Sequence, residues 1–255
     1  MSKAFVSALA RVDAKMAEGG GAPSLALFDR ASGELRALPS PERGVTDLSV
    51  PEGRHWLLLE RSGRERADFR LDLREGSSLD WLNCRGAGPV NSRQVHVILR
   101  DGSRLMHRES LRLGVGESLG QAWHVEMAHP NSLCSIVTRL AQAEGSGSCL
   151  AYNATLAQGS EGSSYDQVAK SMKSGLGCST LIEPNLIVQA KHVQAKHGAS
   201  HAQVDPLSCH ALAARGFSIS EAHRILTQAF LDSAWDGVEL GVEHRAFLEA
   251  PHEPA

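Results

Sequence analysis

Short strand-like runs that recur through most of the chain limit its fold more than any other feature. Between Ser24 and about Ser200, apolar or alternating runs are separated by segments rich in Gly, Ser, Asn and Asp. We expect strands near residues 25–28, 56–59, 69–73, 95–99, 111–113, 124–127, 136–140, 149–154 and 181–188. Many short strands without helices between them predict a sandwich, a barrel or a parallel β-solenoid. Between Arg104 and Gln189 no strong Asn-Gly hairpin signal occurs, which favours the solenoid.

Composition narrows the class of protein. The chain has 255 residues, enough for one large or two small domains, and a net charge of −3. This charge gives no sign of bulk binding to nucleic acid or to an anionic membrane. We find no apolar run long enough to span a bilayer and expect no secretory signal at the N-terminus.

The five cysteines are widely spaced and form no CxxC pair, which predicts reduced thiols in a cytoplasmic protein rather than a zinc ribbon. A cysteine thiolate could bind a cluster, but small core positions are the more ordinary role for such residues. These cysteines are Cys84, Cys134, Cys149, Cys178 and Cys209.

Helical signals lie at both ends of the chain. Apolar residues at helical spacing over 4–17, ended by three glycines, predict a short N-terminal helix. Asp205-Pro206 is typical of a helix start, Gly216 of a helix stop, and Ser218 to Glu221 of a capping box. We therefore divide the chain into an N-terminal helix (1–20), a β-helix core (21–203) and a C-terminal helical subdomain (204–255).

The last predicted helix is apolar on two sides. One side of the helix carries an apolar stripe, and further apolar residues lie on a second side. This distribution indicates burial on more than one side. One side can face its own domain and the other a partner. The candidate partner-binding residues are Ile225, Phe230, Leu231 and Trp235.

A doubled pentapeptide, VQAKH at 188–192 and again at 193–197, precedes this subdomain. With His201 it brings three histidines, His192, His197 and His201, into ten residues, and neutral imidazole is a good ligand for iron or zinc. On a regular strand His197 and His201 would share a face, whereas His192 and His197 would not unless a corner intervenes. One metal site built from all three is therefore not favoured, and each also fits an ordinary surface or interface position.

Charged residues from Glu60 to Asp68 are of mixed sign, which is typical of a solvated face.

The segment from Asp166 to Ala234 resembles the SufB/SufD family, the scaffold proteins of the SUF iron–sulfur cluster assembly system. Residues 183–187 (EPNLI) resemble its KPNLEI strand, and residues 197–200 (HGAS) resemble its HGAT motif. Leu212, Arg215-Gly216, Ser218 and Glu221-Ala222 resemble its helical hairpin. The chain is more similar to SufD, because the SufB pattern has a cysteine where Leu212 stands.

The resemblance implies a mainly β fold, a right-handed parallel β-helix with a C-terminal helical subdomain. It implies a SufD-like scaffold without catalysis of its own, a SufC-type ABC ATPase docked on the C-terminal helices, and a SufB-type partner or a second copy. It also implies that His197 is a ligand of a transient iron–sulfur cluster shared at the subunit interface. In departure from the family, the chain is short for a SufD, and Lys196 stands where a small polar residue is usual.

Two alternatives stay open. A parallel β-helix enzyme acting on carbohydrate would need paired carboxylates, and here Asp and Glu are scattered. No GxSxG, Walker A or HExxH motif is present. A degenerate SufB/SufD homologue that serves only as an interaction module is the other alternative.

Overall fold

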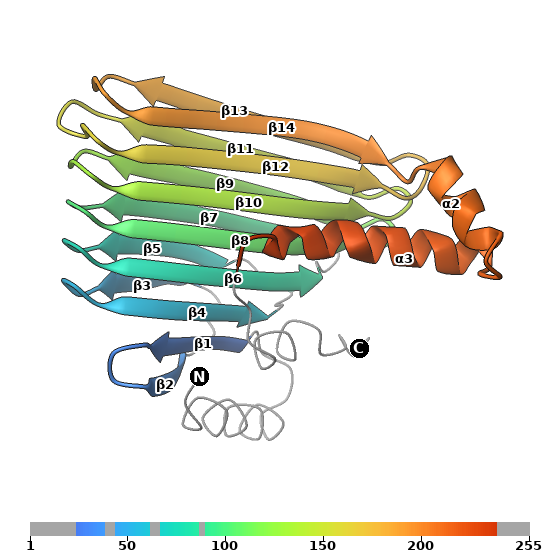
Figure 1. Cartoon of the computed structure of the whole chain (residues 1–255), viewed down its shortest axis with the longest axis horizontal. Helices are drawn as coiled ribbons and strands as arrows, with labels where there is room; N and C mark the ends of the chain where they lie inside the picture. Colours follow the sequence, from blue (N-terminus) through green and yellow to red (C-terminus); the bar gives the residue numbers. More distant parts are fainter. Residues whose placement is uncertain (1–23, 39–43, 62–66, 87–89, 239–255) are drawn as a thin grey trace.

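The structure, a computed structural model, is mainly β with two helices after the strands (Figure 1). It describes residues 24–38, 44–61, 67–86 and 90–238. The N-terminal helix predicted within residues 1–20 lies outside these ranges.

The described strands form two sheets of successive parallel strands, and an antiparallel hairpin extends one end of the larger sheet. The eight-stranded sheet has the order β14-β12-β10-β8-β6-β4-β1-β2, and the six-stranded sheet has the order β13-β11-β9-β7-β5-β3. The strands are β1 (Ser24–Asp29), β2 (Glu34–Leu38), β3 (Gly44–Val50), β4 (His55–Arg61), β5 (Ala67–Leu73), β6 (Ser78–Gly86), β7 (Val90–Leu99), β8 (Arg104–Leu113), β9 (Ser118–Met127), β10 (Leu133–Gln142), β11 (Gly147–Leu156), β12 (Ser164–Lys173), β13 (Ser179–Val188) and β14 (Gln194–Gln203).

From β3 onward the chain alternates between the two sheets, and each strand pairs in parallel with the strand two further along. This arrangement confirms the predicted parallel β-solenoid; its right-handed sense stays a prediction. All nine predicted strand segments lie within observed strands. Of the remaining strands, β2, β3, β6 and β12 were missed, and β14 contains the His197–His201 segment that was considered as a strand.

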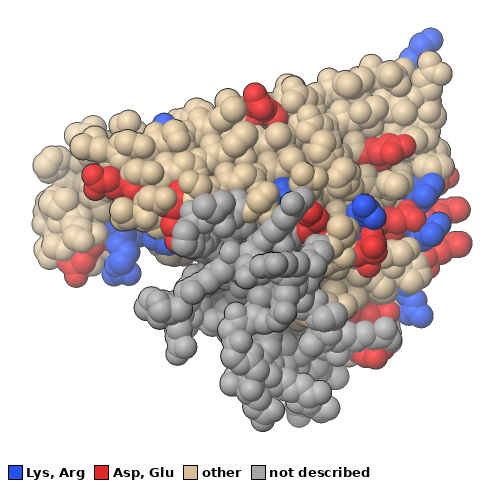
Figure 2. Space-filling model, turned by 180° about the vertical axis from the view of Figure 1, so that it is seen from behind, with Lys and Arg blue, Asp and Glu red and all other residues tan. Residues whose placement is uncertain are grey.

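The corners that lead from a strand of the six-stranded sheet to the next strand, in the eight-stranded sheet, share one backbone conformation. Each has a residue with positive φ: Gly53, Gly76, Gly102, Asn131, Gly162 and His192. Glycine adopts this conformation without steric cost, and Asn and His adopt it more readily than most residues. Corners of successive coils are bonded to each other, as where Gly76 N–H donates to the Asp101 carbonyl at 2.8 Å. Charged side chains gather along this edge of the molecule (right in Figure 2).

The core lies between the two sheets and is formed by alternate residues of the strands, which point inward. Trp81 and Trp123 are fully buried at its centre, with ring centroids 5.7 Å apart. Phe69 packs on Trp81 at 4.8 Å.

Two helices follow the last strand: α2 (Pro206–Ala213) and α3 (Ile219–Asp232), extended by the short 3₁₀ helix η1 (Ser233–Trp235). Asp205 caps α2 by accepting from the backbone N–H groups of Leu207 and Ser208. Ser218 and Glu221 form the predicted capping box of α3. None of the described helices has the length and apolar character needed to cross a membrane.

Helix α3 lies against the outer face of the eight-stranded sheet (Figure 1). Arg112 on β8 donates to Gln228 at 3.0 Å, and Arg139 on β10 donates to Ser233 at 2.9 Å. Trp235 packs on an apolar cluster on this face, formed by Ala26, Leu57, Leu59 and Leu82. The helical subdomain is therefore attached to the solenoid along its side.

The close approach of two corners gives a test of the coil spacing. A Cβ on Gly175 would lie 2.6 Å from the backbone nitrogen of Glu144, whereas a Cβ on Gly198 would meet nothing within 4 Å. Gly175→Ala should lower the free energy of unfolding by about 1–3 kcal/mol, because backbone must move to admit the methyl group. Gly198→Ala, the matched control, should leave it unchanged or raise it by about 0.5 kcal/mol. Urea unfolding followed by circular dichroism measures both, and equal stabilities would contradict this spacing.

Candidate functional site

The last coil, formed by β13 and β14, leaves one end of the solenoid open (top of Figure 1). Each of these strands has a described neighbour on one side only. Their inward-facing side chains are therefore covered by the preceding coil but by no following one. Partly exposed apolar residues result, among them Ile182, Leu186 and Ala195, which pack against the core from this end.

His197 and His201 both lie on the inward side of β14. His197 is in register with Gln167, which is fully buried, and His201 is in register with Ser171, which is also fully buried. The Nδ1 atom of His201 lies 2.8 Å from the Ser171 hydroxyl. Both imidazoles are exposed because no further coil covers them. The expectation that they share a face is confirmed, but four residues of strand separate their Cα atoms by roughly 13 Å.

His192 does not belong to this strand. It occupies the corner between β13 and β14 with a φ of 57°. The doubled VQAKH therefore does not lie on neighbouring strands: the first copy begins at the last residue of β13, and the second runs into β14. A corner does intervene between His192 and the strand that carries His197 and His201, so the three histidines do not lie on one regular strand.

Within the described part of the chain, no group of three or more His, Cys, Asp or Glu residues is placed to hold a metal ion. Two of the five cysteines, Cys134 and Cys209, are buried as predicted for core residues, and burial raises the pKa of the Cys134 thiol. Cys149 is exposed on β11, contrary to that prediction, because its position faces outward.

The helical hairpin formed by α2 and α3 presents a second surface. Of the predicted partner-binding residues, Leu231 is only 3% exposed and Trp235 lies against the sheet of its own chain, whereas Ile225 and Phe230 are half-buried. Three other large apolar side chains of this hairpin are exposed: Leu207, Phe217 and Ile219. Sequence reasoning missed them, because Phe217 and Ile219 lie at the turn rather than on the helical stripe.

Charged and polar groups inside the solenoid form a cluster that the sequence pattern did not reveal. Arg93, fully buried, donates to Glu60 at 2.6 Å and lies 3.8 Å from Glu109. Glu109 also accepts from Asn83 and from Gln121. The placement of Glu60 on a solvated face was wrong, because its position on β4 points inward and it is 4% exposed.

His107 lies next to this cluster, between the rings of Trp81 and Trp123. Its Nε2 atom is 3.9 Å from Glu109, which is an ion-pair distance only if the ring is protonated. Burial lowers the pKa of His107 from the ordinary value of 6.5, although the Glu109 carboxylate opposes this shift. The imidazole is therefore neutral inside the core at neutral pH.

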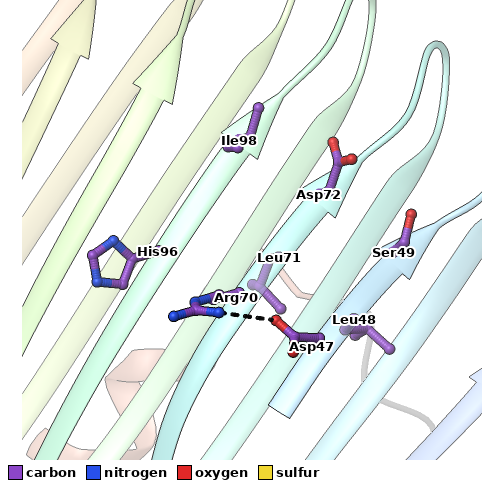
Figure 3. A pocket seen from close by; sticks show the side chains of 8 residues that line it. All are labelled: Asp47, Leu48, Ser49, Arg70, Leu71, Asp72, His96 and Ile98. Carbon is purple, nitrogen blue, oxygen red and sulfur yellow. Dashed lines mark ion pairs between the residues drawn. The ribbon is translucent and has the colours of Figure 1, made fainter. Parts of the chain in front are cut away.

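A shallow groove of about 400 Å³ lies on the outer face of β3, β5 and β7 (Figure 3). Its two carboxylates are both paired with arginine: Asp47 lies 4.0 Å from Arg70, and Asp72 contacts Arg74 and Arg100 at 3.1 Å. Its other lining residues are Leu48, Ser49, Leu71, His96 and Ile98. A glycoside hydrolase requires two carboxyl groups that flank the scissile bond, one of them held protonated, and these arginine-paired groups do not suit that role.

Comparison with protein families gives one match. The profile of the SUF system FeS cluster assembly SufBD core domain matches residues 61–230, which is more than half of the chain. The matched stretch extends from the end of β4 through the open end and the hairpin to Phe230 on α3. No curated protein matches the chain at a significant level.

The buried His107 predicts a loss of stability in mild acid. Because its pKa is lower in the folded than in the unfolded chain, only the unfolded chain takes up this proton as pH falls below about 6.5. The free energy of unfolding should therefore fall by up to about 1.4 kcal/mol per pH unit through this group. His107→Phe, which keeps an aromatic ring between the tryptophans, should reduce the slope between pH 6.5 and 5.5.

Urea unfolding at pH 7.5, 6.5 and 5.5 measures this slope. His210→Phe, at an exposed position on α2, is the control and should keep the original slope. An unchanged slope in His107→Phe would assign the acid sensitivity to other groups.

Proposed function

Because the chain belongs to the family of the SUF system FeS cluster assembly SufBD core domain, we propose that it acts as a SufD-like scaffold subunit without catalysis of its own. Its family places it in iron–sulfur cluster assembly. The SufD-like assignment is supported by Leu212, which stands where the SufB pattern has a cysteine. Cys209, the nearest thiol along the chain, is buried against Val204 and Ala222 and is poorly placed to replace it.

The observation that carries this proposal is the open end of the solenoid. A scaffold subunit must present ligands at a surface that a partner completes, and His197 projects from such a surface. We propose that a SufB-type partner covers β13 and β14 and that His197 supplies one imidazole to a nascent cluster. The partner's thiolates supply the remaining ligands, consistent with the lack of a complete metal-binding group among the described residues.

The helical hairpin suits the docking of a SufC-type ATPase. Helix α2 lies beyond the ends of the strands (right in Figure 1), and on this hairpin Leu207 is 77% exposed and Ile219 is 52% exposed. We propose that these side chains and Phe217 together form the apolar anchor of the ATPase, since contiguous exposed apolar surface marks protein interaction sites. The ATPase would hydrolyse ATP, and its motion would act on the hairpin and on the adjoining open end.

The carbohydrate-enzyme alternative finds little support. The groove in Figure 3 has no free pair of carboxylates, and the open end bears histidines and apolar side chains instead of acids. The upper part of the rear face, over β9, β11 and β13, is largely uncharged (Figure 2). We propose that the protein is cytoplasmic. A reducing cytoplasm would keep its five cysteines as free thiols, and all five are free cysteines in the structure.

His197→Ala tests the ligand role. The side chain is exposed, so the variant should fold and bind its partners, but cluster formation on the complex should fall strongly because one ligand is lost. Iron and sulfide content and the visible absorption of the complex, co-expressed with SufB-type and SufC-type partners, measure this. His55→Ala, at an exposed position on β4 outside both proposed partner surfaces, is the control. Normal cluster content in His197→Ala, with partner binding retained, would instead support a pure interaction module.

Phe217→Asp and Leu207→Asp test the hairpin. Either change should weaken binding of a SufC-type ATPase by about tenfold or more, because a charge would replace an apolar anchor. Arg224→Ala changes an exposed polar residue of the same hairpin and should leave binding unchanged. Titration calorimetry measures the affinities, and equal affinities for all three variants would place the ATPase elsewhere.

A further inference from the structure

Two histidines lie side by side on the outer face of the six-stranded sheet. His96 on β7 and His124 on β9 are partners in the parallel register of these strands, so their side chains leave the sheet in the same direction. Both side chains are exposed. Their imidazole rings are stacked, with centroids 4.7 Å apart and planes 14° apart. Neighbouring strands of a sheet are about 4.8 Å apart, so the backbone itself holds the two rings at this spacing.

The ring nitrogens of this pair are available to a ligand. Neither imidazole forms a hydrogen bond or an ion pair with another residue that the structure describes. Burial and the neighbouring His96 ring lower the pKa of the His124 imidazole from its ordinary value of 6.5. His124 is therefore neutral at neutral pH, and neutral imidazole is the form that binds metal ions.

The residues on either side of the pair belong to the same row of the sheet. Arg70 on β5 is in register with His96, and Asn153 on β11 is in register with His124. The Arg70 guanidinium forms an ion pair with Asp47 on β3, 4.0 Å away (Figure 3). The Asn153 amide makes hydrogen bonds within the sheet. Both neighbours are therefore engaged elsewhere, and the two imidazoles face solvent.

One carboxylate lies close to the pair. Glu126 follows His124 by two residues on β9, so it leaves the sheet on the same face, about 7 Å along the strand. Its side chain is exposed and has no ion pair with any described residue. This carboxylate attracts a cation bound between the histidines, directly or through a coordinated water molecule.

These surroundings favour a cation over an anion. An anionic ligand needs a positive charge that is free to hold it, but Arg70 is paired with Asp47 and the His124 ring is neutral. Imidazole nitrogen suits Cu²⁺, Ni²⁺ and Zn²⁺, whereas Mg²⁺ and Ca²⁺ prefer oxygen ligands. The donor atoms thus select a divalent transition-metal ion.

The two rings reach one ion after a rotation of their side chains. Two nitrogen ligands bound to one ion at about 2.0–2.1 Å lie roughly 3.3 Å apart in a tetrahedral arrangement. The stacked rings, with centroids at 4.7 Å, must therefore turn toward each other. The outer torsion of a histidine side chain is broad, so this rotation costs little. The strands beneath stay in place, because β7 and β9 are each paired on both sides.

We propose that His96 and His124 form a binding site for one divalent transition-metal ion, completed by water molecules and by the adjoining Glu126 carboxylate. Cu²⁺ binds most tightly, in line with the general order of affinity for nitrogen ligands. Because no group of three such ligands is already in position among the described residues, the affinity depends on the two imidazoles. Once the first binds the ion, the second is held nearby at high effective concentration.

This site is separate from the surfaces of the proposed function. It lies on the outer face of the six-stranded sheet, whereas α3 lies on that of the eight-stranded sheet. Two further strands of its own sheet, β11 and β13, separate it from the open end. The inference therefore does not rest on a role in cluster assembly.

Titration calorimetry of the purified chain without an affinity tag, with Cu²⁺, tests the site, and electron paramagnetic resonance counts its nitrogen ligands. We expect one ion per chain at this site and two nitrogen ligands. His96→Ala and His124→Ala should each weaken binding at least tenfold, because the chelate is lost. The double variant should bind like either single variant, since one remaining imidazole is no better than any other exposed histidine. His55→Ala and His197→Ala, which change exposed histidines elsewhere, are the controls and should retain the site.

Two charge variants separate a metal site from a purely structural histidine pair. Glu126→Gln should weaken Cu²⁺ binding several-fold, because it removes the nearby negative charge. Arg70→Gln should tighten it several-fold, because it removes a positive charge from the neighbouring strand. All of these side chains are exposed, so the melting temperature in EDTA should stay close to that of the wild type.

An unchanged affinity and nitrogen count in either His96→Ala or His124→Ala would overturn the proposal. So would losses that add up in the double variant, because they would indicate two separate sites with one histidine each. The cluster content of a complex with a SufB-type partner does not enter this experiment. Failure of the zinc-group metal site and failure of the proposed function are therefore distinguished by different measurements.

Discussion

Parallel pairing between successive coils is the constraint on which this structure depends. Each strand satisfies half of its backbone groups on the preceding coil and half on the following one, in an unbroken register from β4 to β14 and from β3 to β13. At the start, β1 and β2 close the eight-stranded sheet with an antiparallel hairpin. At the other end, the described chain continues from β14 into α2 and α3 and forms no further coil. The free edge of β14 and the histidines upon it are consequences of this single interruption.

The same register stacks side chains into rows, and this explains how charges are tolerated in the core. Glu60, Asn83, Glu109 and Thr138 occupy one row on successive strands of the eight-stranded sheet. Removing carboxylates from water is costly unless hydrogen bonds and an opposite charge compensate. Here Arg93 supplies the charge from the facing sheet, and Asn83 and Gln121 donate to Glu109. The polar row thus links four coils through interactions that require the correct register, which is a form of specificity that an all-apolar core lacks.

Sequence patterns predicted the elements whose signals are local. The capping box at Ser218 and the cap at Asp205 involve residues within one helical turn, so both could be located from the sequence and both are observed. Strands β6 and β12 were missed because their inward positions include polar residues such as Asn83, Gln167 and Ser171, which hide the apolar alternation. Glu60 was misplaced for the same reason. Its environment is created by Arg93 on another strand, and no local pattern contains that information.

At the candidate site, too, sequence patterns predicted the local features but not the contacts between strands. The family resemblance identified His197, but its register with Gln167 and the bond between His201 and Ser171 depend on which coil lies beneath β14.

The solenoid geometry also connects the two surfaces of the proposed function. Only Val204 and Asp205 separate the end of β14 from α2, and Val204 is buried together with Cys209 and Ala222 of the two helices. A force applied to α2 would therefore reach the free strand edge through a connection of two residues, of which Val204 is packed against both helices and Asp205 caps α2. By contrast, α3 is tied to β8 and β10 by the bonds of Arg112 and Arg139. Within the proposed function, a partner that moved α2 would therefore act on the last coil, while α3 stays attached to the side of the solenoid.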